Sequence, residues 1–338
     1  MKKQWIFGFL VLALCLALCA CGESESAAEP TSAPAASSSP TPTPTPAPTP
    51  KPAPTPEPTP TPTPDVELQS EIIPWDTTEL TLDSDEGLDE ALEKLPLLER
   101  VDLTACKLEI ARMDELFELR PDVDFIFTLR FAEWEVRSDI TCFSTMRKYR
   151  SDAPECGHYT QDELYPLLRY CRHLRALDLG HNHLSDLTLI GELKELQVLI
   201  LADNPDVVDI SPLSNLTELR FLELFLCRKI NDFSPLEKLT KLQDLNLCYC
   251  AELDDLSFLD TMPDFENGWF SYTKITPEDL DAIRAERPTL NLVCANMPEG
   301  SSTGFGWRDS LRTRAIRNAF GQWRAVLDWR SWDDVVYR

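Results

Sequence analysis

The chain of 338 residues is long enough to bury a sizeable core, and its 57 acidic against 32 basic side chains give a formal net charge of −25 at pH 7. This balance excludes nucleic acid as an expected partner, because its phosphates would be repelled, and it favours polar or cationic partners. Prolines crowd residues 30–64, so that stretch differs in kind from the rest of the chain.

Residues 1–21 have the pattern of an export signal. Lys2 and Lys3 precede an apolar stretch that is short for a membrane span, which needs about 20 residues. The stretch ends in the sequence LCACG from Leu18, which resembles the bacterial lipobox, whose cysteine is lipidated. We therefore expect Cys21 to carry a lipid and the rest of the chain to lie outside the cytoplasm, anchored to the bacterial cell membrane. An uncleaved anchor helix is the alternative.

Residues 22–64 are expected to form a disordered tether. After a Ser-, Ala- and Glu-rich start, Pro and Thr alternate from Pro40 to Pro64. Proline fixes the backbone dihedral φ and removes hydrogen-bond donors, so the stretch favours polyproline II at about 3.1 Å per residue and reaches on the order of 100 Å. Such a spacer after a lipid anchor would hold a domain away from the membrane.

Residues 65–129 are predicted to be divergent repeats of a longer, helical kind. Their apolar periodicity alternates between that of strands and that of amphipathic helices. We expect strands at 80–82 and 123–129, helices at 87–95 and 110–119, and a repeat core at 98–106 with Val101 in a leucine position.

Residues 130–160 break this phase and are predicted to be an insertion between two parts of one solenoid. Residues 131–140 alternate as a strand or hairpin does, whereas 144–159 is polar and irregular. A helix over residues 161–171 then leads back into a regular pattern.

The most regular part of the chain is a tandem array within residues 161–294. Four stretches with the pattern L-x-x-L-x-L-x-x-N/C begin 22 or 23 residues apart, at Leu174, Leu196, Leu219 and Leu242. Their closing positions are Asn182, Asn204, Cys227 and Cys250. The L-x-L core has period two, so both leucines face one side of a short strand, and only stacked copies bury that side.

These motifs are the leucine-rich repeat signature, and their tails, such as D-I-S-P-L from Asp209, resemble the short internalin-like repeats of bacteria. The resemblance implies an α/β solenoid, curved, with parallel strands on its concave face. It also implies that repeat asparagines hydrogen-bond the turn backbone and that cysteines replace them as small buried residues. The run from Phe125 to Asp139, followed by the array, looks like uncharacterised repeat lipoproteins of anaerobic bacteria, a family with no established activity.

The array ends in a weaker copy at 265–273, a helix capped by Thr276 and a last strand at 290–293. Residues 295–338 then carry a basic amphipathic pattern, with apolar residues recurring at helical spacing from Leu311. Two interpretations stay open for this tail. It is either a cap that docks its apolar face on the solenoid and its arginines on the acidic surface, or a helix that binds membranes.

Signals for a metal site or a disulfide are weak. His181 and His183 flank a repeat asparagine and have no further ligand at a suitable spacing, so we expect no metal and no cofactor. Cys142 and Cys156 are a candidate disulfide pair in an oxidising compartment. The alternative is that the cysteines beyond the signal are buried structural residues.

Catalytic motifs are also missing from the sequence. No G-x-S-x-G motif and no Gly-rich phosphate loop occurs, and 11 glycines are few for such a loop. We therefore predict that the chain is not an enzyme. The alternative of this class is a hydrolase whose site lies in residues 130–160, with Asp152, Glu155 and His158 as candidates.

The repeat register names the residues of the concave face, and a stripe of them is predicted to bind a partner. The stripe consists of Val198, Ile200, Phe221, Glu223, Phe225, Tyr249 and Trp269. Solvated strand faces are usually polar, so this apolar stripe indicates a contact site, with an acidic rim that includes Asp178, Asp203 and Asp244. The alternative is that the insertion or the tail covers the stripe within the same chain.

The function predicted from these features is a surface-displayed, lipid-anchored leucine-rich repeat module that binds a protein or peptide partner on its concave face. A structural cell-envelope protein without a specific ligand is the alternative. Neither hypothesis names the ligand or the oligomeric state.

Overall fold

The computed structural model describes residues 65–131, 134–145, 158–294 and 310–320. The predicted export signal with Cys21, the predicted tether and Cys156 lie outside the described residues. Within the described ranges, no helix has the length and apolar character needed to cross a membrane.

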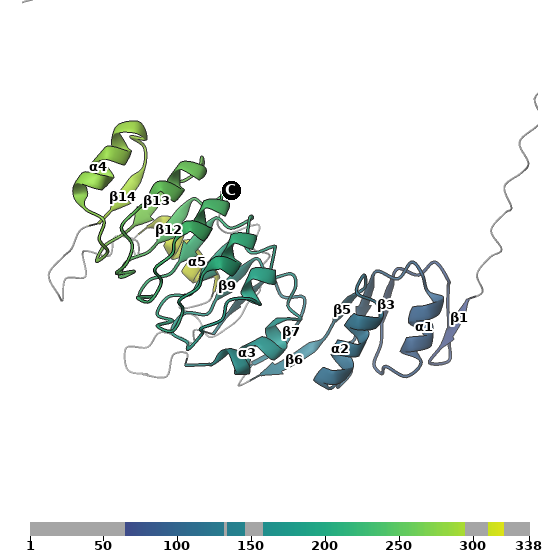
Figure 1. Cartoon of the computed structure of the whole chain (residues 1–338). Helices are drawn as coiled ribbons and strands as arrows, with labels where there is room; N and C mark the ends of the chain where they lie inside the picture. The colour runs from purple at the N-terminus through teal and green to yellow at the C-terminus, as the bar shows by residue number, and fades with distance from the viewer. Residues whose placement is uncertain (1–64, 132–133, 146–157, 295–309, 321–338) are drawn as a thin grey trace, which may run out of the picture. The chain divides into compact units, whose positions relative to one another are not determined.

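The N-terminal part of the fold is built on a small parallel sheet (Figure 1). β1 (Val66–Leu68) and β2 (Glu71–Ile73) form an antiparallel pair ahead of it. Its strands are β3 (Glu79–Thr81), β4 (Arg100–Asp102) and β5 (Asp124–Ile126), and its connecting helices are α1 (Leu88–Lys94) and α2 (Ile110–Leu119). Val101 lies between Leu80 and Phe125 in the register, so the leucine position predicted for Val101 is confirmed.

The array forms one seven-stranded parallel sheet whose spatial order follows the chain. Its strands are β8 (Cys142–Ser144), β9 (Ala176–Asp178), β10 (Val198–Ile200), β11 (Phe221–Glu223), β12 (Asp244–Asn246), β13 (Asn267–Trp269) and β14 (Asn291–Val293). The return segments contain α3 (Gln161–Leu168), the 3-10 helices η1 (Ile190–Glu192), η2 (Ser211–Asn215), η3 (Ser234–Lys238) and η4 (Ser257–Thr261), and α4 (Pro277–Glu286). Figure 1 shows these helices along one side of the sheet.

The strand register is the one that the repeat spacing predicts. Val198 pairs with Phe221 across β10 and β11, and Phe221 in turn pairs with Asp244 on β12. Each central leucine therefore stacks on the leucine of the next copy, as Leu199 does on Leu222. The predicted leucine-rich repeat solenoid, with its α/β repeats and parallel strands, is confirmed.

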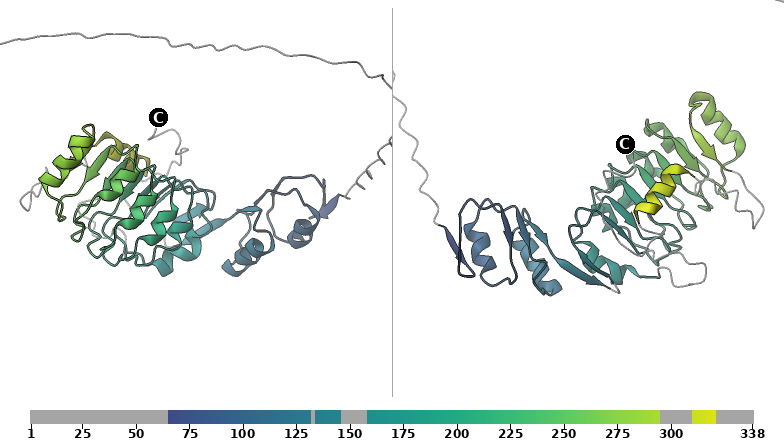
Figure 2. Two further views of the ribbon diagram at one scale, coloured as in Figure 1. Left: turned by 45° about the horizontal axis from the view of Figure 1, so that its top comes forward. Right: turned by 180° about the vertical axis from the view of Figure 1, so that it is seen from behind.

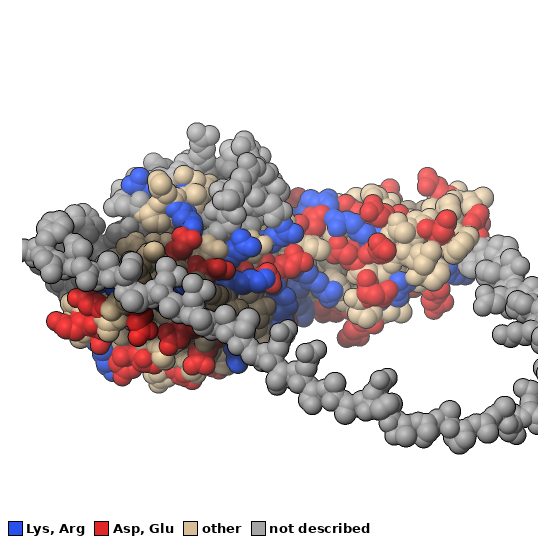
Figure 3. Space-filling model, turned by 90° about the horizontal axis from the view of Figure 1, so that it is seen from above, with Lys and Arg blue, Asp and Glu red and all other residues tan. Residues whose placement is uncertain are grey.

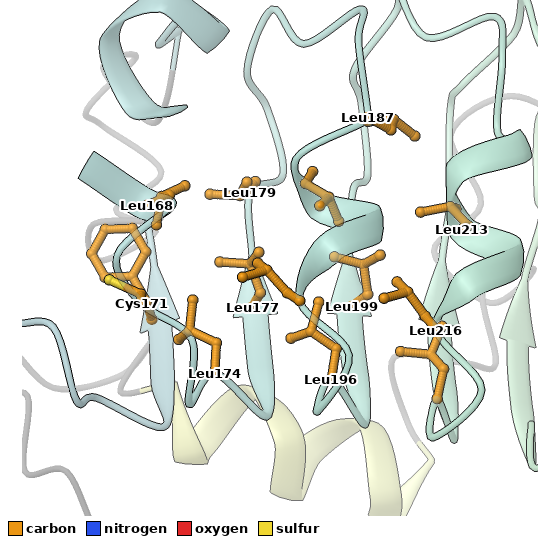
Figure 4. Packing of buried hydrophobic residues seen from close by; sticks show 14 of the residues in the cluster. Leu168, Cys171, Leu174, Leu177, Leu179, Leu187, Leu196, Leu199, Leu213 and Leu216 are labelled. Atoms are coloured by element: carbon orange, nitrogen blue, oxygen red, sulfur yellow. The ribbon is translucent and has the colours of Figure 1, made fainter. Parts of the chain in front are cut away.

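The leucines of all copies form one continuous core between the sheet and the return segments. Leu174, Leu177 and Leu179 of one copy are fully buried, as are Leu196 and Leu199 of the next. Figure 4 shows them in repeating rows, with the same positions of neighbouring copies side by side. Because each copy buries its leucines only against its neighbours, the core exists only in the stacked array.

The residue that closes each copy holds the turn together. Asn204 accepts a hydrogen bond from Leu184 N and donates to the carbonyl oxygens of Leu179 and Leu201, at 2.9 and 3.0 Å. Cys250 is buried at the equivalent position, and its Sγ donates to Leu224 O at 3.3 Å. Cysteine thus preserves one of the bonds that asparagine makes to the preceding copy, and burial raises the pKa of the Cys250 thiol, which keeps the S–H donor in place.

The second repeat motif has its own physical role. In each copy the Asp of the tail accepts hydrogen bonds from the residue two positions later, as Asp209 does from Ser211 N and Oγ at 2.8 and 3.0 Å. These bonds satisfy the backbone N–H and the hydroxyl donor at the start of the 3-10 helix that follows, where a proline such as Pro212 lies in the first turn. The motif therefore directs the chain from each concave strand into its return segment.

The segment predicted to be an insertion contributes to the sheet. β6 (Thr128–Phe131) and β7 (Trp134–Arg137) form an antiparallel hairpin, and β8 pairs with β9 as the edge strand of the array. His158 N donates to His181 O at 2.8 Å, and both histidines have positive φ, at 76° and 57°. His158 therefore occupies the turn position of a further copy. The repeat phase is lost in the sequence only because additional residues separate Thr145 from His158 inside that copy.

Candidate functional site

The candidate site lies on the concave face, which is the face of the seven-stranded sheet that points away from the leucine core. A second buried cluster covers this face and is separate from the leucine core. It consists of Cys142, Ala176, Val198, Ile200, Ala202, Phe221, Phe225, Cys248, Trp269, Ile316 and Phe320. Ile316 and Phe320 come from a distant part of the chain, so the tail meets this face.

The segment that supplies them is α5 (Leu311–Ala319), a short amphipathic helix. Ser310 caps it, since its Oγ accepts a hydrogen bond from Thr313 N at 3.1 Å. Thr313, Ile316 and Phe320 are buried along one side, whereas Leu311 is 85% exposed. Figure 2 shows α5, in yellow, lying across the strands of the sheet in the right-hand view. Its buried side includes Ile316, whereas Ala315 is only half-buried.

Two arginines of α5 pair with carboxylates of the concave face. Arg312 donates to Asp244 Oδ2 at 2.7 Å and to Glu266 Oε2 at 2.9 Å. Nη2 of Arg317 lies 3.1 Å from both carboxylate oxygens of Glu223. Glu223 and Asp244 are both 0% exposed, so these two carboxylates are shielded from water, unlike the acidic side chains that lie on the surface in Figure 3.

Burial dominates the electrostatics of this contact. It raises the pKa of Asp244 above its ordinary value of 3.8, while the hydrogen bond from Arg312 opposes that rise. Removing the arginine would leave the burial without its compensating charge, which is the costly arrangement for a carboxylate. The face is therefore suited to a cationic occupant.

One buried polar group beneath this contact is left over. Asn246 is 1% exposed and pairs with Glu223 in the strand register. Its Oδ1 accepts from Cys248 N at 3.1 Å, which identifies Nδ2 as the remaining donor. Among the described residues, Nδ2 of Asn246 has no hydrogen-bond partner. A buried amide donor of this kind is uncommon, because leaving it unpaired costs free energy.

An aromatic row lines one edge of the concave face. Tyr249 stacks on Tyr272 with ring centroids 4.3 Å apart, and Phe225 meets Tyr249 edge to face at 5.6 Å. The guanidinium of Arg228 lies 5.4 Å from the Tyr249 ring. Tyr249 and Tyr272 are half-buried, so this edge extends the buried cluster toward solvent.

The structure brings the predicted stripe residues together but does not leave them open. Six of them are buried, and Tyr249 alone is half-buried; the six are Val198, Ile200, Phe221, Glu223, Phe225 and Trp269. Of the two alternatives, the one in which the tail lies on the stripe applies in the described residues. The predicted acidic rim is likewise buried at Asp178, Glu223 and Asp244, with Asp203 half-buried. Whether the stripe binds a partner stays a prediction.

The weaker chemical candidates are placed elsewhere. His181 Nδ1 lies 2.9 Å from Asp203 Oδ2, and His183 stacks on His158 with centroids 5.6 Å apart. No three metal-ligating side chains gather in the described ranges. Cys142 is a free, buried thiol of the concave cluster in this structure, and its predicted partner Cys156 lies outside the described residues.

The alternative hydrolase site has only one described member. Asp152 and Glu155 lie outside the described residues, and His158 sits at a repeat turn with an exposed side chain. Its backbone N–H is used by His181 O, which explains its position without catalysis. Asn246 is a residue of the concave face that the predicted stripe does not include. Its position in the face was predictable from the register, whereas its unpaired amide depends on three-dimensional contacts.

Comparisons with known proteins give structural similarity alone. No family model matches the sequence, and no curated protein matches it. Internalin InlF of Listeria monocytogenes is 22% identical, with 56% of this chain and 48% of that chain covered and a TM-score of 0.35. Internalin InlC2 of the same species is 22% identical, with 45% and 70% covered and a TM-score of 0.34. The leucine-rich repeat protein LIC12759 of Leptospira interrogans is 15% identical, with 60% and 56% covered and a TM-score of 0.30.

The match spans about half the length of InlF, so nothing of that protein's activity is carried over. The fold assignment stands on the register of the sheet, the stacked leucines and the repeated turn contacts. By these features the array has the fold of a leucine-rich repeat solenoid.

Proposed function

We propose that the chain is a recognition module that binds a protein or peptide partner on its concave face, displayed outside the cytoplasm on a lipid anchor at Cys21. The binding part is supported by one observation, the seating of α5. An amphipathic helix rests on this face with apolar side chains in the buried cluster and arginines on its carboxylates. A surface with this shape and charge suits a helical segment of another protein.

The display part is supported by the sequence pattern alone. Lys2 and Lys3, the short apolar stretch and the LCACG sequence that contains Cys21 are the features of an exported lipoprotein. The Pro-Thr tether that follows would carry the repeats away from the membrane surface. A binding face on such a tether reaches partners that lie beyond the membrane.

The binding proposal is tested on the full chain with a fluorescent synthetic peptide of residues 310–320 as the probe. In the chain, Ile316→Asp together with Phe320→Asp places charges in the buried cluster, and we call this double substitution the released variant because it frees the concave face from α5. We expect saturable, one-to-one binding of the peptide to the released variant in fluorescence anisotropy.

A matched control removes the two buried carboxylates. In the released variant, Glu223→Gln with Asp244→Asn keeps side-chain size but removes the charges that face the peptide arginines, so binding should weaken at least tenfold. Circular dichroism must show that both proteins keep the repeat fold. A folded released variant that binds no peptide would reject the concave face as a recognition site and favour a structural envelope protein.

A further inference from the structure

We infer that α5 is a built-in competitor for the partner site, and that the partner it competes with is an amphipathic helix bearing two arginines spaced as Arg312 and Arg317 are. This inference rests on the proposed function and specifies the ligand chemistry and regulation of the same surface. It follows from four features of the contact: its buried charges, the spacing of its apolar side chains, its unpaired amide and the shortness of the helix.

The buried carboxylates specify the charge of any occupant. Glu223 and Asp244 lie within or beside an apolar cluster and are matched by Arg317 and Arg312. An apolar helix without arginines would bury these carboxylates unpaired, which is strongly unfavourable. A partner that displaces α5 therefore has to bring its own cations to both positions. Arginine suits the positions better than lysine, because its planar guanidinium can bridge two carboxylates as Arg312 does.

The apolar part specifies a helix. Arg312, Ile316 and Phe320 recur at intervals of four residues, which places them on one face of α5. Ile316 and Phe320 belong to the same buried cluster as Phe221 and Trp269. An extended peptide would not present two arginines and two apolar side chains to the same face with this spacing.

The unpaired amide indicates that α5 is an incomplete ligand. Asn246 Nδ2 is buried beside Glu223 and finds no acceptor in the described residues. A partner helix with an oxygen acceptor at this point, such as a glutamine or serine side chain, would accept a hydrogen bond from Nδ2 and would therefore bind more favourably than α5. The face therefore accepts α5 without being fully complementary to it.

The helix is also easy to release. It has nine residues, and isolated helices of that length are marginal in water, so α5 depends on the concave face for its order. The leucine core does not include Ile316 or Phe320, so release leaves the repeats intact. Segments with few contacts of this kind open at a lower free energy than the core.

Competition has a measurable consequence. For a ligand that binds only the open face, the apparent association constant equals the intrinsic one multiplied by the fraction of molecules in which the face is open. The peptide of residues 310–320 should therefore bind the released variant at least roughly tenfold more tightly than the wild-type full chain. For the charge requirement, a peptide with Arg317→Gln should bind the released variant at least tenfold more weakly, whereas Leu311→Gln is the matched control, because Leu311 is 85% exposed on the same helix.

The outcomes separate this inference from the proposed function. Tighter binding to the released variant, with loss at Arg317→Gln and not at Leu311→Gln, supports the inference. Equal affinity for wild-type and released chains, both folded, overturns the competitor role while leaving the binding function standing. Equal losses for the Arg317→Gln and Leu311→Gln peptides overturn the charge requirement. Absence of binding to either folded chain rejects the proposed function itself. Light scattering that shows a peptide-sensitive wild-type dimer would assign α5 to a second copy and overturn competition within one chain.

Discussion

Leu222 and its neighbour Phe221 on β11 allow a matched test of the two faces of the sheet. Their side chains are 0% and 1% exposed, so burial alone does not distinguish them. Leu222 belongs to the leucine core, and Phe221 belongs to the concave cluster that contains Ile316 and Phe320. Consecutive residues of a strand point to opposite faces, so each substitution probes one face.

Leu222→Ala should lower the free energy of unfolding by about 2–5 kcal/mol, as truncation of a fully buried leucine does. The value should lie in the upper part of that range, because β10 and β12 pair with β11 on both sides and limit collapse of the cavity. The loss should affect the whole array, since the stacked leucines of neighbouring copies share one core.

Phe221→Ala should behave differently although it removes a larger side chain. Truncating a buried phenylalanine typically costs about 3–5 kcal/mol when the whole surrounding core is one cooperative unit. Here part of the surrounding layer is α5, which the repeats do not require. Once the substitution has released α5, the contacts of α5 can no longer add to the destabilisation. The free energy of unfolding of the repeats should therefore fall by less than it does in Leu222→Ala.

Urea unfolding followed by circular dichroism measures the stability of the repeats, and hydrogen exchange of the 311–319 amides measures the docking of α5. Leu222→Ala should shift the urea midpoint, and Phe221→Ala should mainly accelerate exchange in α5. A loss below about 1 kcal/mol for Leu222→Ala would contradict the assigned register. Equal midpoint shifts for the two variants, with α5 exchange unchanged in Phe221→Ala, would show that α5 belongs to the repeat core.

Three further predictions concern single positions. Cys21→Ala should leave the chain unprocessed as a lipoprotein, and mass spectrometry that finds a diacylated N-terminus elsewhere would contradict the assignment. Cys250→Ala should cost about 1–3 kcal/mol, because it removes a buried side chain and its S–H bond to Leu224 O, which keeps the bond from Cys227 N, whereas Cys250→Asn should cost less in the same urea assay. Hydrogen bonds from Ser234 lower the pKa of Asp232 below its ordinary value of 3.8. The ionised Asp232 side chain therefore stabilises the fold above pH 3.8, and this stabilisation is lost as the pH falls through the lowered pKa. An Asp232→Asn chain whose acid unfolding midpoint equals that of the wild type would argue against this contribution.

The repeated part of the fold was predictable because its determinants are local and periodic. The spacing of Leu196 and Leu219 determines which strand residues pair, and the helix predicted at 110–119 has the same bounds as α2. The phase was misjudged where additional residues between Thr145 and His158 interrupt a copy that still contributes β8 to the sheet. A fixed-period search cannot recover such a copy from spacing alone.

The state of the candidate site was less predictable, because it depends on contacts between distant residues. The register correctly placed Phe221 and Phe225 on one face, but the cover over that face comes from Ile316, far along the chain. The pair of Arg317 and Glu223 spans 94 positions, and no local pattern links the two. Sequence reasoning therefore identified the composition of the surface and left its occupant open.

The placement of Glu223 and Asp244 is hard to explain by stability alone. Buried ion pairs usually contribute little net stability, since the cost of removing both charges from water offsets their attraction, and apolar residues of similar size often serve as well. On this face, however, the neighbouring positions are already apolar, so an uncharged version would accept many apolar helices. The two carboxylates disfavour every occupant that lacks matching cations, so they contribute to the specificity of binding more than to its affinity. A face that was only a structural seat for α5 would not need that discrimination, and this is the physical reason to regard it as a recognition surface.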